Sequence, residues 1–412
     1  MKKAIIVSIG NEILSGLAVD TNTVYLCGKL LSVGLPVIGS YMVGDDVGSI
    51  VRAFNRASEE ADVVLVTGGL GPTADDLTRQ ALAEFLSVEL KLDEGLLREI
   101  QDFYARRDLQ MPPSNKVQAY MPAGSKSLEN KLGTAPGIFA EAKGKLFFAM
   151  PGVPSEMKQM FEESVFDELK KCATEQAVVV KRLKCFGTGE SNIAALLGDL
   201  MSRGRNPLIN CTAGHGVITL NIVSTAKDSD TAREMLVRDE QLIRDKLGEL
   251  VFGQGEQTLA GVVGEELTRL NKKVAVAESC TGGIIAGLLT STPGASKYFT
   301  YGWVTYSNDA KNTELAVPAD LIEEHGAVSE QVATAMAKGA RRKGGTDFAI
   351  GVTGIAGPTG GSEDKPVGLV YICVASDKDY ETKRFIFDQE RALIRHRAAL
   401  TALNMLRLKL RA

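Results

Sequence analysis

The sequence predicts an α/β protein with three domains, and three observations support this fold class. The chain has 412 residues, which is enough for two or three domains. Apolar runs alternate with helical patterns, an order typical of mostly parallel sheets covered by helices. Glycine-rich turns follow several of the apolar runs. We place the domains at residues 1–168, 169–253 and 257–412, with a glycine-containing turn at 253–257 before the last one.

The composition disfavours several classes of protein. A net charge of −4 gives no support for a nucleic-acid or acidic-membrane surface, and no apolar run is long enough to span a bilayer. We therefore expect no nucleic-acid partner and no membrane partner. Six scattered cysteines without a C-x-x-C pair disfavour a disulfide framework and a structural zinc site, so we expect a cytoplasmic location. The chain has only three histidines, His215, His325 and His396, and this scarcity disfavours Ser-His-Asp catalysis. His325 is predicted to end a helix.

The first domain shows the alternation most clearly. We predict strands at residues 3–9, 36–43, 62–67 and 145–150, and helices over 20–33, 47–60 and 75–87. Glycines follow three of the strands, at Gly10, Gly68 and Gly152. Because ligands of open α/β sheets bind at the carboxyl ends of strands, these turns predict a single pocket.

The loop at residues 67–76 is the strongest signal in this domain. It reads Thr-Gly-Gly-Leu-Gly-Pro-Thr-Ala-Asp-Asp. Its glycines let the backbone approach a ligand closely and present N–H groups to a phosphate. Asp75 and Asp76 are suitable ligands for a hard cation such as Mg²⁺. The alternative is a glycine turn whose aspartates cap the following helix.

Residues 170–250 differ from the first domain and predict a small α+β module. We expect strands at 177–184 and 217–224, and helices over 191–202 and 229–247. This module resembles a KH-like or a ferredoxin-like insert.

The last domain is predicted to be a second α/β unit. Its strands are expected at residues 273–277, 301–306, 347–352 and 367–375, and its helices over 257–270, 329–343 and 390–409. Residues 274–283 read Val-Ala-Val-Ala-Glu-Ser-Cys-Thr-Gly-Gly, and a helical pattern follows at once. This is the pattern of a buried strand that turns directly into a helix.

Ser279 and Thr281 lie where the first N–H groups of that helix are free to bind an anion. A serine in this place is either a helix cap or a nucleophile. Cys280 is an alternative nucleophile, although free cysteines are usually buried and inert. The turn alone does not decide between these roles.

The motifs at these turns resemble the CinA family. The loop at residues 67–76 is similar to the Thr-Gly-Gly-x-Gly-Pro-Thr-x-Asp-Asp motif of molybdopterin-binding domains of the MogA/MoeA type. The CinA version of that domain is matched at residues 10–16, 20–22, 115–119, 130–137 and 151–157. The C-terminal CinA domain is matched at residues 277–283, 301–311, 326–329, 352–358 and 365–368.

The resemblance implies that the N-terminal domain hydrolyses ADP-ribose or a related diphosphate with a divalent metal, which is Mg²⁺, Mn²⁺ or Co²⁺. It places Asp75 and Asp76 near the metal. The residues implied to bind the substrate are Gly68, Gly69 and Gly71 on the loop, Asn22, and Lys116 or Lys131 as neutralising cations.

For the C-terminal domain the resemblance implies hydrolysis of nicotinamide mononucleotide (NMN) to nicotinic acid mononucleotide and ammonia, without a cofactor. Ser279 would be the nucleophile and Lys311 the base, provided that burial lowers the lysine pKa enough to free its lone pair. Tyr306 would relay protons, and Thr353 would orient the amide or the lysine. The residues implied to bind the substrate are Thr281, Gly282, Gly283, Gly354 and Arg391.

Two readings of the whole chain remain at this stage. In the first, it is a two-activity enzyme of pyridine-nucleotide recycling that acts on the small molecules NMN and ADP-ribose. In the second, the N-terminal domain is a non-catalytic nucleotide- or pterin-binding module that serves regulation linked to competence. The resemblance also suggests a homodimer.

Overall fold

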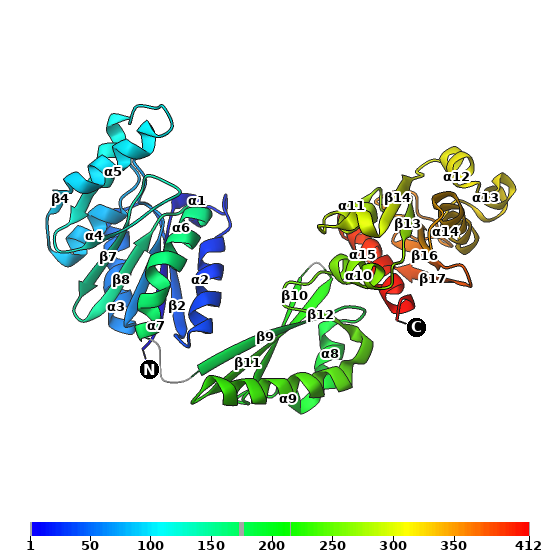
Figure 1. Ribbon diagram of the computed structural model, residues 1–412, viewed down its shortest axis with the longest axis horizontal. Helices are drawn as coiled ribbons and strands as arrows, with labels where there is room; N and C mark the ends of the chain where they lie inside the picture. The colour runs from blue at the N-terminus through cyan, green and yellow to red at the C-terminus, as the bar shows by residue number, and fades with distance from the viewer. Residues whose placement is uncertain (1, 173–176, 215, 412) are drawn as a thin grey trace. The chain divides into compact units, whose positions relative to one another are not determined.

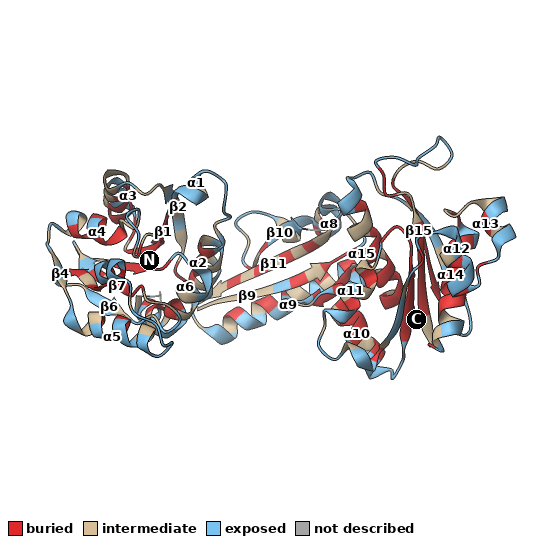
Figure 2. Cartoon of the chain, turned by 90° about the horizontal axis from the view of Figure 1, so that it is seen from above, coloured by how far each residue is buried: buried red, intermediate tan, exposed pale blue. Residues whose placement is uncertain are grey.

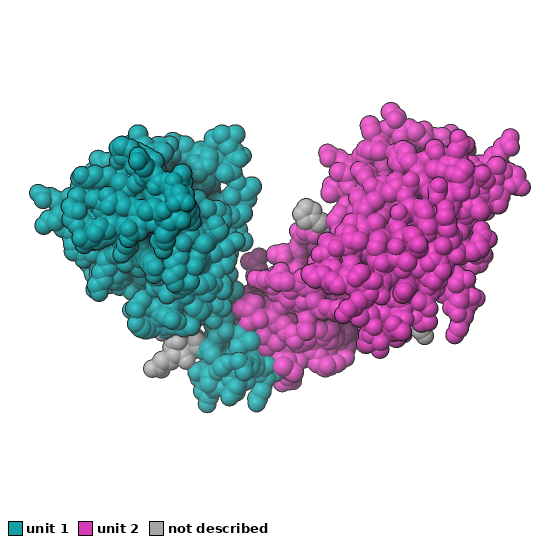
Figure 3. All heavy atoms as spheres, turned by 45° about the horizontal axis from the view of Figure 1, so that its top comes forward, with its two compact units in different colours: residues 1–179, 224–234 teal, residues 180–223, 235–412 magenta. Residues whose placement is uncertain are grey.

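The computed structural model describes residues 2–172, 177–214 and 216–411. Contacts within the chain divide it into two compact units, which Figure 3 colours separately. The first unit comprises residues 1–179 and 224–234, and the second comprises residues 180–223 and 235–412. Among the described residues, no helix is long and apolar enough to cross a membrane.

The first unit is built on a six-stranded sheet with the strand order β2-β1-β3-β8-β7-β6. The strands are β1 (Ala4–Ile9), β2 (Val37–Val43), β3 (Val63–Thr67), β6 (Lys126–Leu128), β7 (Gly137–Ala142) and β8 (Lys145–Met150). Strands β1, β2, β3 and β8 are parallel, whereas β7 and β6 run antiparallel at one edge. The predicted parallel sheet is therefore confirmed, and the edge strands β6 and β7 add to it.

Helices cover both faces of this sheet, as Figure 1 shows. One face packs against α3 (Val47–Glu60), α4 (Thr78–Leu86) and α5 (Glu94–Ala105), and the other against α2 (Thr21–Ser32), α6 (Pro154–Met160) and α7 (Phe166–Cys172). Side chains of β1 alternate between the two layers: Ile5 and Val7 join the first, and Ala4 and Ile6 the second. Shorter elements are α1 (Asn11–Leu14), β4 (Leu90–Leu92), β5 (Tyr120–Pro122) and a 3-10 helix (Pro113–Ala119).

Helix α4 corrects one predicted boundary. The helix expected over 75–87 begins only at Thr78. The preceding residues stay in the loop because the Asp76 carboxylate accepts hydrogen bonds from the backbone N–H groups of Gly71 and Thr73. These bonds close the loop on itself, so the helix begins three residues later than predicted.

The middle module has a four-stranded sheet with the order β10-β11-β9-β12. Its elements are β9 (Ala177–Cys185), α8 (Glu190–Leu197), β10 (Leu208–Gly214), β11 (Val217–Ala226), α9 (Ser229–Leu247) and β12 (Val251–Gln254). The helix expected over 191–202 ends at Leu197, where a 3-10 turn at Gly198–Met201 takes over. Strand β10 was not predicted, because its mixed polar sequence has no apolar run and it forms by pairing with β11.

The C-terminal domain is built on a five-stranded sheet with the order β14-β13-β15-β16-β17. The strands are β13 (Val274–Glu278), β14 (Phe299–Val304), β15 (Phe348–Gly354), β16 (Leu369–Ala375) and β17 (Tyr380–Ile386). Strands β14, β13 and β15 are parallel, and β16 and β17 are antiparallel. Figure 2 shows the central strand β15 buried along most of its length.

Six helices cover this sheet. One face carries α10 (Leu259–Arg269), α11 (Ile284–Thr290) and α15 (Arg391–Lys409), and the other carries α12 (Asn308–Leu315), α13 (Ala319–His325) and α14 (Glu330–Gly344). Helix α12 was not predicted. Of α13, only the end was predicted, and His325 does end this helix. Strand β14 ends at Val304 rather than at residue 306, so Thr305 and Tyr306 lie in the connection to α12.

Candidate active sites

The turn that follows β13 is held by the last residue of that strand. Glu278 is fully buried, and its carboxylate accepts hydrogen bonds from the backbone N–H groups of Gly283 (3.0 Å), Ile285 (3.2 Å) and Ala286 (2.8 Å). The start of α11 thus already carries an anion that belongs to the protein. The sequence predicts that the first N–H groups of this helix are free to bind an anion, but the Gly283 N–H donates to Glu278 instead.

Ser279 and Lys311 meet in this turn. Lys311 lies on α12, and its Nζ is 3.2 Å from Ser279 Oγ, although 32 residues separate them. Both side chains are buried, Ser279 with 8% and Lys311 with 1% of its surface exposed. The contact that the proposed chemistry requires is therefore present.

Two backbone carbonyls orient the lysine amine. Lys311 Nζ donates to the carbonyl oxygens of Thr305 (2.9 Å) and Tyr306 (3.4 Å). A neutral amine has two N–H donors and one lone pair, so these carbonyls leave the lone pair for the Ser279 hydroxyl. Burial lowers the pKa of Lys311 below that of an ordinary lysine, because desolvation disfavours the charged form. The geometry accommodates a neutral amine as well as an ammonium, and desolvation favours the neutral form, so Lys311 is suited to act as a base.

Cys280 has a different environment from its neighbour. Burial raises the pKa of its thiol to about 12, so the sulfur is protonated near neutral pH. Because the thiolate is the nucleophilic form of cysteine, this shift disfavours Cys280 as the nucleophile. Its side chain packs in the hydrophobic core beside β13.

Two arginines of α15 reach the same region. Arg395 Nε and Nη2 donate to the carbonyl oxygens of Cys280 (3.0 Å) and Thr281 (2.9 Å), so its guanidinium holds the turn in place. Arg391 donates to the Gly357 carbonyl (2.6 Å) and to the Tyr306 hydroxyl (3.2 Å). The Tyr306 side chain is exposed, and it is the backbone carbonyl of this residue that contacts Lys311.

Thr353 and Gly354 lie at the end of β15, beside the turn. The backbone N–H of Ser279 donates to the Val352 carbonyl, which ties the turn to this strand. The Thr353 side chain is buried and its hydroxyl donates to the Ala327 carbonyl at 2.7 Å. The hydroxyl thus holds the segment before α14 and does not contact the lysine, so of its two predicted roles only orientation of the amide stays a prediction.

The second candidate site lies in the first unit, at the carboxyl ends of β1, β3 and β8. A pocket of about 420 Å³ is lined there by residues that include Gly68, Gly69, Gly71, Asn22 and Gly152. Gly68 has φ +102°, and a Cβ at this position would lie 2.1 Å from the Ile9 carbonyl oxygen. Only glycine fits this close approach of two strand ends.

The charged side chains that line this pocket are all acidic: Glu12, Asp45, Asp75, Asp76 and Glu156. Asp76 uses both carboxylate oxygens to hold the loop, through Gly71 and Thr73. Asp75 is exposed, and the Thr73 hydroxyl lowers the pKa of its carboxyl. Among the described residues, no three acidic, histidine or cysteine side chains form a ready metal cluster. A divalent cation would fit here with Asp75 and substrate oxygens as ligands, which is the usual way proteins hold Mg²⁺.

Asn22 lies on the wall of the pocket. Its Nδ2 donates to Thr67 Oγ1 and to the Gly152 carbonyl, both at 2.8 Å. Its Oδ1 is buried and makes no hydrogen bond within the described part of the protein. A buried polar atom without a partner is costly, and a ligand with a hydrogen-bond donor would satisfy it.

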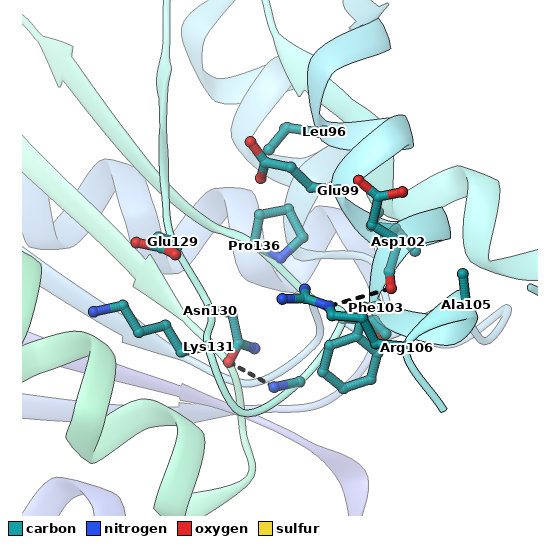
Figure 4. A pocket seen from close by; sticks show the side chains of 13 residues that line it. Leu96, Glu99, Asp102, Phe103, Ala105, Arg106, Glu129, Asn130, Lys131 and Pro136 are labelled. Carbon is teal, nitrogen blue, oxygen red and sulfur yellow. Dashed lines mark hydrogen bonds between the residues drawn. The ribbon is translucent and has the colours of Figure 1, made fainter. Parts of the chain in front are cut away.

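The two lysines expected to neutralise a phosphate lie elsewhere. Lys116 is exposed in the 3-10 helix and is absent from the residues that line the pocket. Lys131 forms an ion pair of 2.9 Å with Glu163 and lines a neighbouring cleft (Figure 4). The structure therefore does not support either lysine as a ligand of the glycine-loop pocket.

Sequence reasoning missed the side chains that hold both turns. The sequence shows Glu278 only as the end of an apolar run. It places Arg395 on the same helix face as Arg391, where the pair is predicted either to clamp a substrate phosphate or to face solvent, whereas Arg395 binds the carbonyls of the turn. Arg79 was missed as well: it is buried and donates to the carbonyls of Leu70 and Gly71 at 2.6 Å each, and burial lowers its pKa to about 10. A charged residue inside an apolar segment was the available signal. His215 lies outside the described residues, and His396 lies on α15.

Family models match three consecutive parts of the chain. Residues 5–171 match the probable molybdopterin binding domain, residues 180–253 the damage-inducible protein CinA KH domain, and residues 256–410 the CinA C-terminal domain. The predicted three-domain α/β architecture is thereby confirmed. Of the two folds considered for the middle module, the match selects the KH domain.

Curated relatives match the chain from end to end. A putative competence-damage inducible protein of Caldicellulosiruptor bescii is 44% identical over 405 residues, which cover 98% of each chain. One from Clostridium novyi is 41% identical over 408 residues, which cover 99% of this chain and 98% of the relative. A crystal structure of the protein CinA from Thermoplasma acidophilum is 37% identical and covers 40% of this chain and 97% of its own, with a TM-score of 0.38. The full-length matches show that the chain belongs to the CinA family.

Proposed function

We propose that the chain hydrolyses the carboxamide of nicotinamide mononucleotide, giving nicotinic acid mononucleotide and ammonia. The family resemblance suggests this substrate. The observation that supports the chemistry is the 3.2 Å contact between the Lys311 amine and the Ser279 hydroxyl, both buried. Amide hydrolysis needs a nucleophile and a group that takes and returns its proton, and these two side chains supply both.

In the proposed reaction, Ser279 Oγ attacks the amide carbon while Lys311 Nζ accepts the hydroxyl proton. The resulting ammonium has three N–H donors, which match Ser279 Oγ and the carbonyls of Thr305 and Tyr306. It gives a proton to the departing nitrogen, so ammonia leaves and an ester remains on Ser279. Water then attacks the ester with Lys311 as the base, and the acid is released as Ser279 regains its proton.

The test is an assay of ammonia release from NMN by the full-length protein and its variants. We expect turnover by the wild type without added metal, turnover by Cys280→Ala, and none by Ser279→Ala. If Ser279→Ala kept the full rate while Cys280→Ala lost it, the nucleophile would be Cys280.

We also propose a second activity, the hydrolysis of ADP-ribose or a related diphosphate at the glycine-loop pocket. Support comes from the charge of the lining, which is acidic without lysine or arginine. An anionic diphosphate would be repelled there unless a cation came with it, which fits the dependence on a divalent metal that the resemblance implies. The metal would neutralise the diphosphate charge when bound, with Asp75 as its protein ligand, while Asn22 Oδ1 would accept a hydrogen bond from the substrate.

The alternative for this domain is a binding module without turnover. Release of AMP from ADP-ribose with Mg²⁺, Mn²⁺ or Co²⁺, measured beside calorimetry with ADP-ribose and with molybdopterin, separates the two. AMP release supports the hydrolase. Tight binding without turnover under every metal supports the module.

A further inference from the structure

The connection between β14 and α12 carries a buried hydroxyl that the proposed amide hydrolysis does not use. It belongs to Thr305, whose surface is fully buried. Its Oγ1 makes no hydrogen bond within the described part of the chain. Because a buried polar atom without a partner is destabilising, such a group calls for a functional explanation.

The register of the sheet places Thr305 next to the proposed nucleophile. In the parallel pairing of β13 with β14, Glu278 lies opposite Val304. The Thr305 N–H donates to the Glu278 carbonyl at 2.8 Å, which carries the pairing one residue further. Ser279 and Thr305 are therefore neighbours at the ends of adjacent strands, and adjacent strands lie about 4.8 Å apart.

The two side chains also share one face of the sheet. Ala277 and Trp303, which lie two residues before Ser279 and Thr305, both pack with the helices α12, α13 and α14. Since side chains alternate along a strand, residues two apart lie on the same face. Lys311 reaches the pair from α12, where its Nζ bonds to Ser279 Oγ and to the carbonyl of Thr305. The free hydroxyl thus lies on the same face as the nucleophile and its base.

The other hydroxyls around the pair are less suited to assist the nucleophile. The Thr353 hydroxyl already donates to a backbone carbonyl, and the Tyr306 side chain is exposed. Thr281 Oγ1 is also buried without a partner in the described residues, but Thr281 lies in the turn past the strand ends. Thr305 therefore combines a free hydroxyl with a position in register with Ser279.

We propose that the Thr305 hydroxyl donates a hydrogen bond to Ser279 Oγ whenever this oxygen carries negative charge. The first occasion is the attack on the amide, when Lys311 takes the serine proton. The second is the release of the acid, when Oγ leaves the acyl carbon and regains its proton. Thr305 keeps its own proton throughout. The inference deepens the proposed amide hydrolysis and rests on it for these two steps.

Two physical arguments support this role. A hydrogen bond to a charged oxygen is stronger than one between neutral groups, so the bond stabilises the charged Oγ more than the resting hydroxyl. Hydrogen bonds of this kind often form only in the reacting complex, which agrees with a Thr305 hydroxyl that has no partner before the substrate binds.

The test compares two substitutions in the full-length protein. Thr305→Val removes the hydroxyl and keeps the shape, and it should lower kcat for ammonia release from NMN about 10- to 100-fold, with KM within about twofold. Thr305→Ser keeps the hydroxyl and should stay within about threefold of the wild type. Thr346→Val, which removes another buried hydroxyl just before β15, is the matched control and should keep the wild-type rate.

A second readout does not depend on the identity of the substrate. Ser279 of the full-length protein is allowed to react with phenylmethanesulfonyl fluoride, and the modified residue is followed by mass spectrometry. Oγ bonds to the sulfur and fluoride leaves, so the reaction reports the nucleophile alone. Labelling should slow about 10- to 100-fold in Thr305→Val and should remain near the wild-type rate in Thr305→Ser.

The order of the two variants decides between a hydrogen bond and packing. If Thr305 only filled space, Thr305→Val would be active and Thr305→Ser impaired, and this order would overturn the inference. Ammonia release that Thr305→Val leaves unchanged rejects the role of Thr305 and keeps the hydrolase. Labelling that slows in Thr305→Val without any ammonia release rejects NMN as the substrate and keeps the role of Thr305. A wild type that is neither active nor labelled overturns both.

Discussion

The two candidate sites are held by the same kind of scaffold. In each, a carboxylate accepts hydrogen bonds from N–H groups of a glycine-rich loop, Asp76 in the first unit and Glu278 in the C-terminal domain. In each, one guanidinium donates hydrogen bonds to two consecutive carbonyls of that loop. Arg79 bonds to residues 70–71, and Arg395 bonds to residues 280–281. Both loops follow a buried parallel strand.

The chemistry placed on these scaffolds differs. The C-terminal turn adds a hydroxyl and a buried amine, Ser279 and Lys311, which can exchange a proton. Among the described residues, the lining of the glycine-loop pocket adds carboxylates and no lysine or arginine, so no side chain there offsets the charge of a diphosphate. In both sites the loop sets the geometry. In the proposed reactions, the side chains added to the loop decide whether a cation is needed.

The largest effect is expected from Ser279→Ala. Loss of the nucleophile should lower kcat for ammonia release from NMN by about 10³-fold or more, since residual catalysis would depend on binding alone. Release of AMP from ADP-ribose should not change, because it belongs to the other site. Both activities are measured on one preparation. A parallel loss of AMP release would contradict the assignment of the two activities to separate sites.

Lys311→Met should come next, with a loss of about 10²- to 10⁴-fold in kcat for NMN, the range for removal of a general base. Lys311→Arg should not restore activity, because a guanidinium stays protonated. Lys343→Met, a change at an exposed ion pair with Glu314, is the matched control and should leave the rate unchanged. An active Lys311→Arg enzyme would contradict the role of the lysine as a base.

Removal of divalent metal with EDTA should affect the glycine-loop pocket and not the site of Ser279 and Lys311. AMP release should fall by about 10²-fold or more, since no cation would offset the charge of the diphosphate. Ammonia release should stay within about twofold of its original rate. Restoration of AMP release by Mg²⁺, Mn²⁺ or Co²⁺ checks that the loss is reversible, and two activities that fell together would break the comparison.

The smallest effect tests the scaffold shared by the two sites. Glu278→Gln keeps the size of the side chain but cannot accept all three N–H groups equally well, so the turn should shift and kcat for NMN should fall about tenfold. Asp76→Asn should act in the same way on AMP release alone. Rescue by Glu278→Asp is not expected, because its shorter side chain withdraws the carboxylate. An effect on KM alone would show that the carboxylate serves binding rather than position.

The pattern of residues predicted the strand–turn–helix at Ser279. The family resemblance predicted that Ser279 pairs with Lys311. It did not predict that Lys311 lies on a helix. Helix α12 is short and polar, so its apolar residues show no helical periodicity. Its clearest sequence signal is the N-cap residue Ser307.

The side chains that hold the two turns could be noticed as charged residues in apolar segments, but their bonding partners could not be predicted from the sequence. Arg395 acts on a carbonyl 115 residues away, and contacts of a side chain with a distant backbone leave no mark in periodicity or composition. The glycine loop was predicted from its residues, but the use of Asp76 to hold it was considered only as helix capping. Lys131 was predicted to neutralise a phosphate, but it pairs with Glu163 instead. A motif shows which residues are adjacent in sequence, and it does not show that Glu163 lies next to Lys131 in space.

The most direct test of the account is the pH dependence of kcat/KM for NMN, measured from about pH 5 to about pH 10. An ordinary lysine has a pKa of about 10.4, and burial lowers that of Lys311. Because the neutral amine is the active form, activity should be present above the lowered pKa and lost as the pH falls through it. The account predicts a rising limb with an apparent pKa clearly below 10.4. A flat profile, or a rate that rises only near 10.4, would contradict a neutral Lys311 as the base for Ser279.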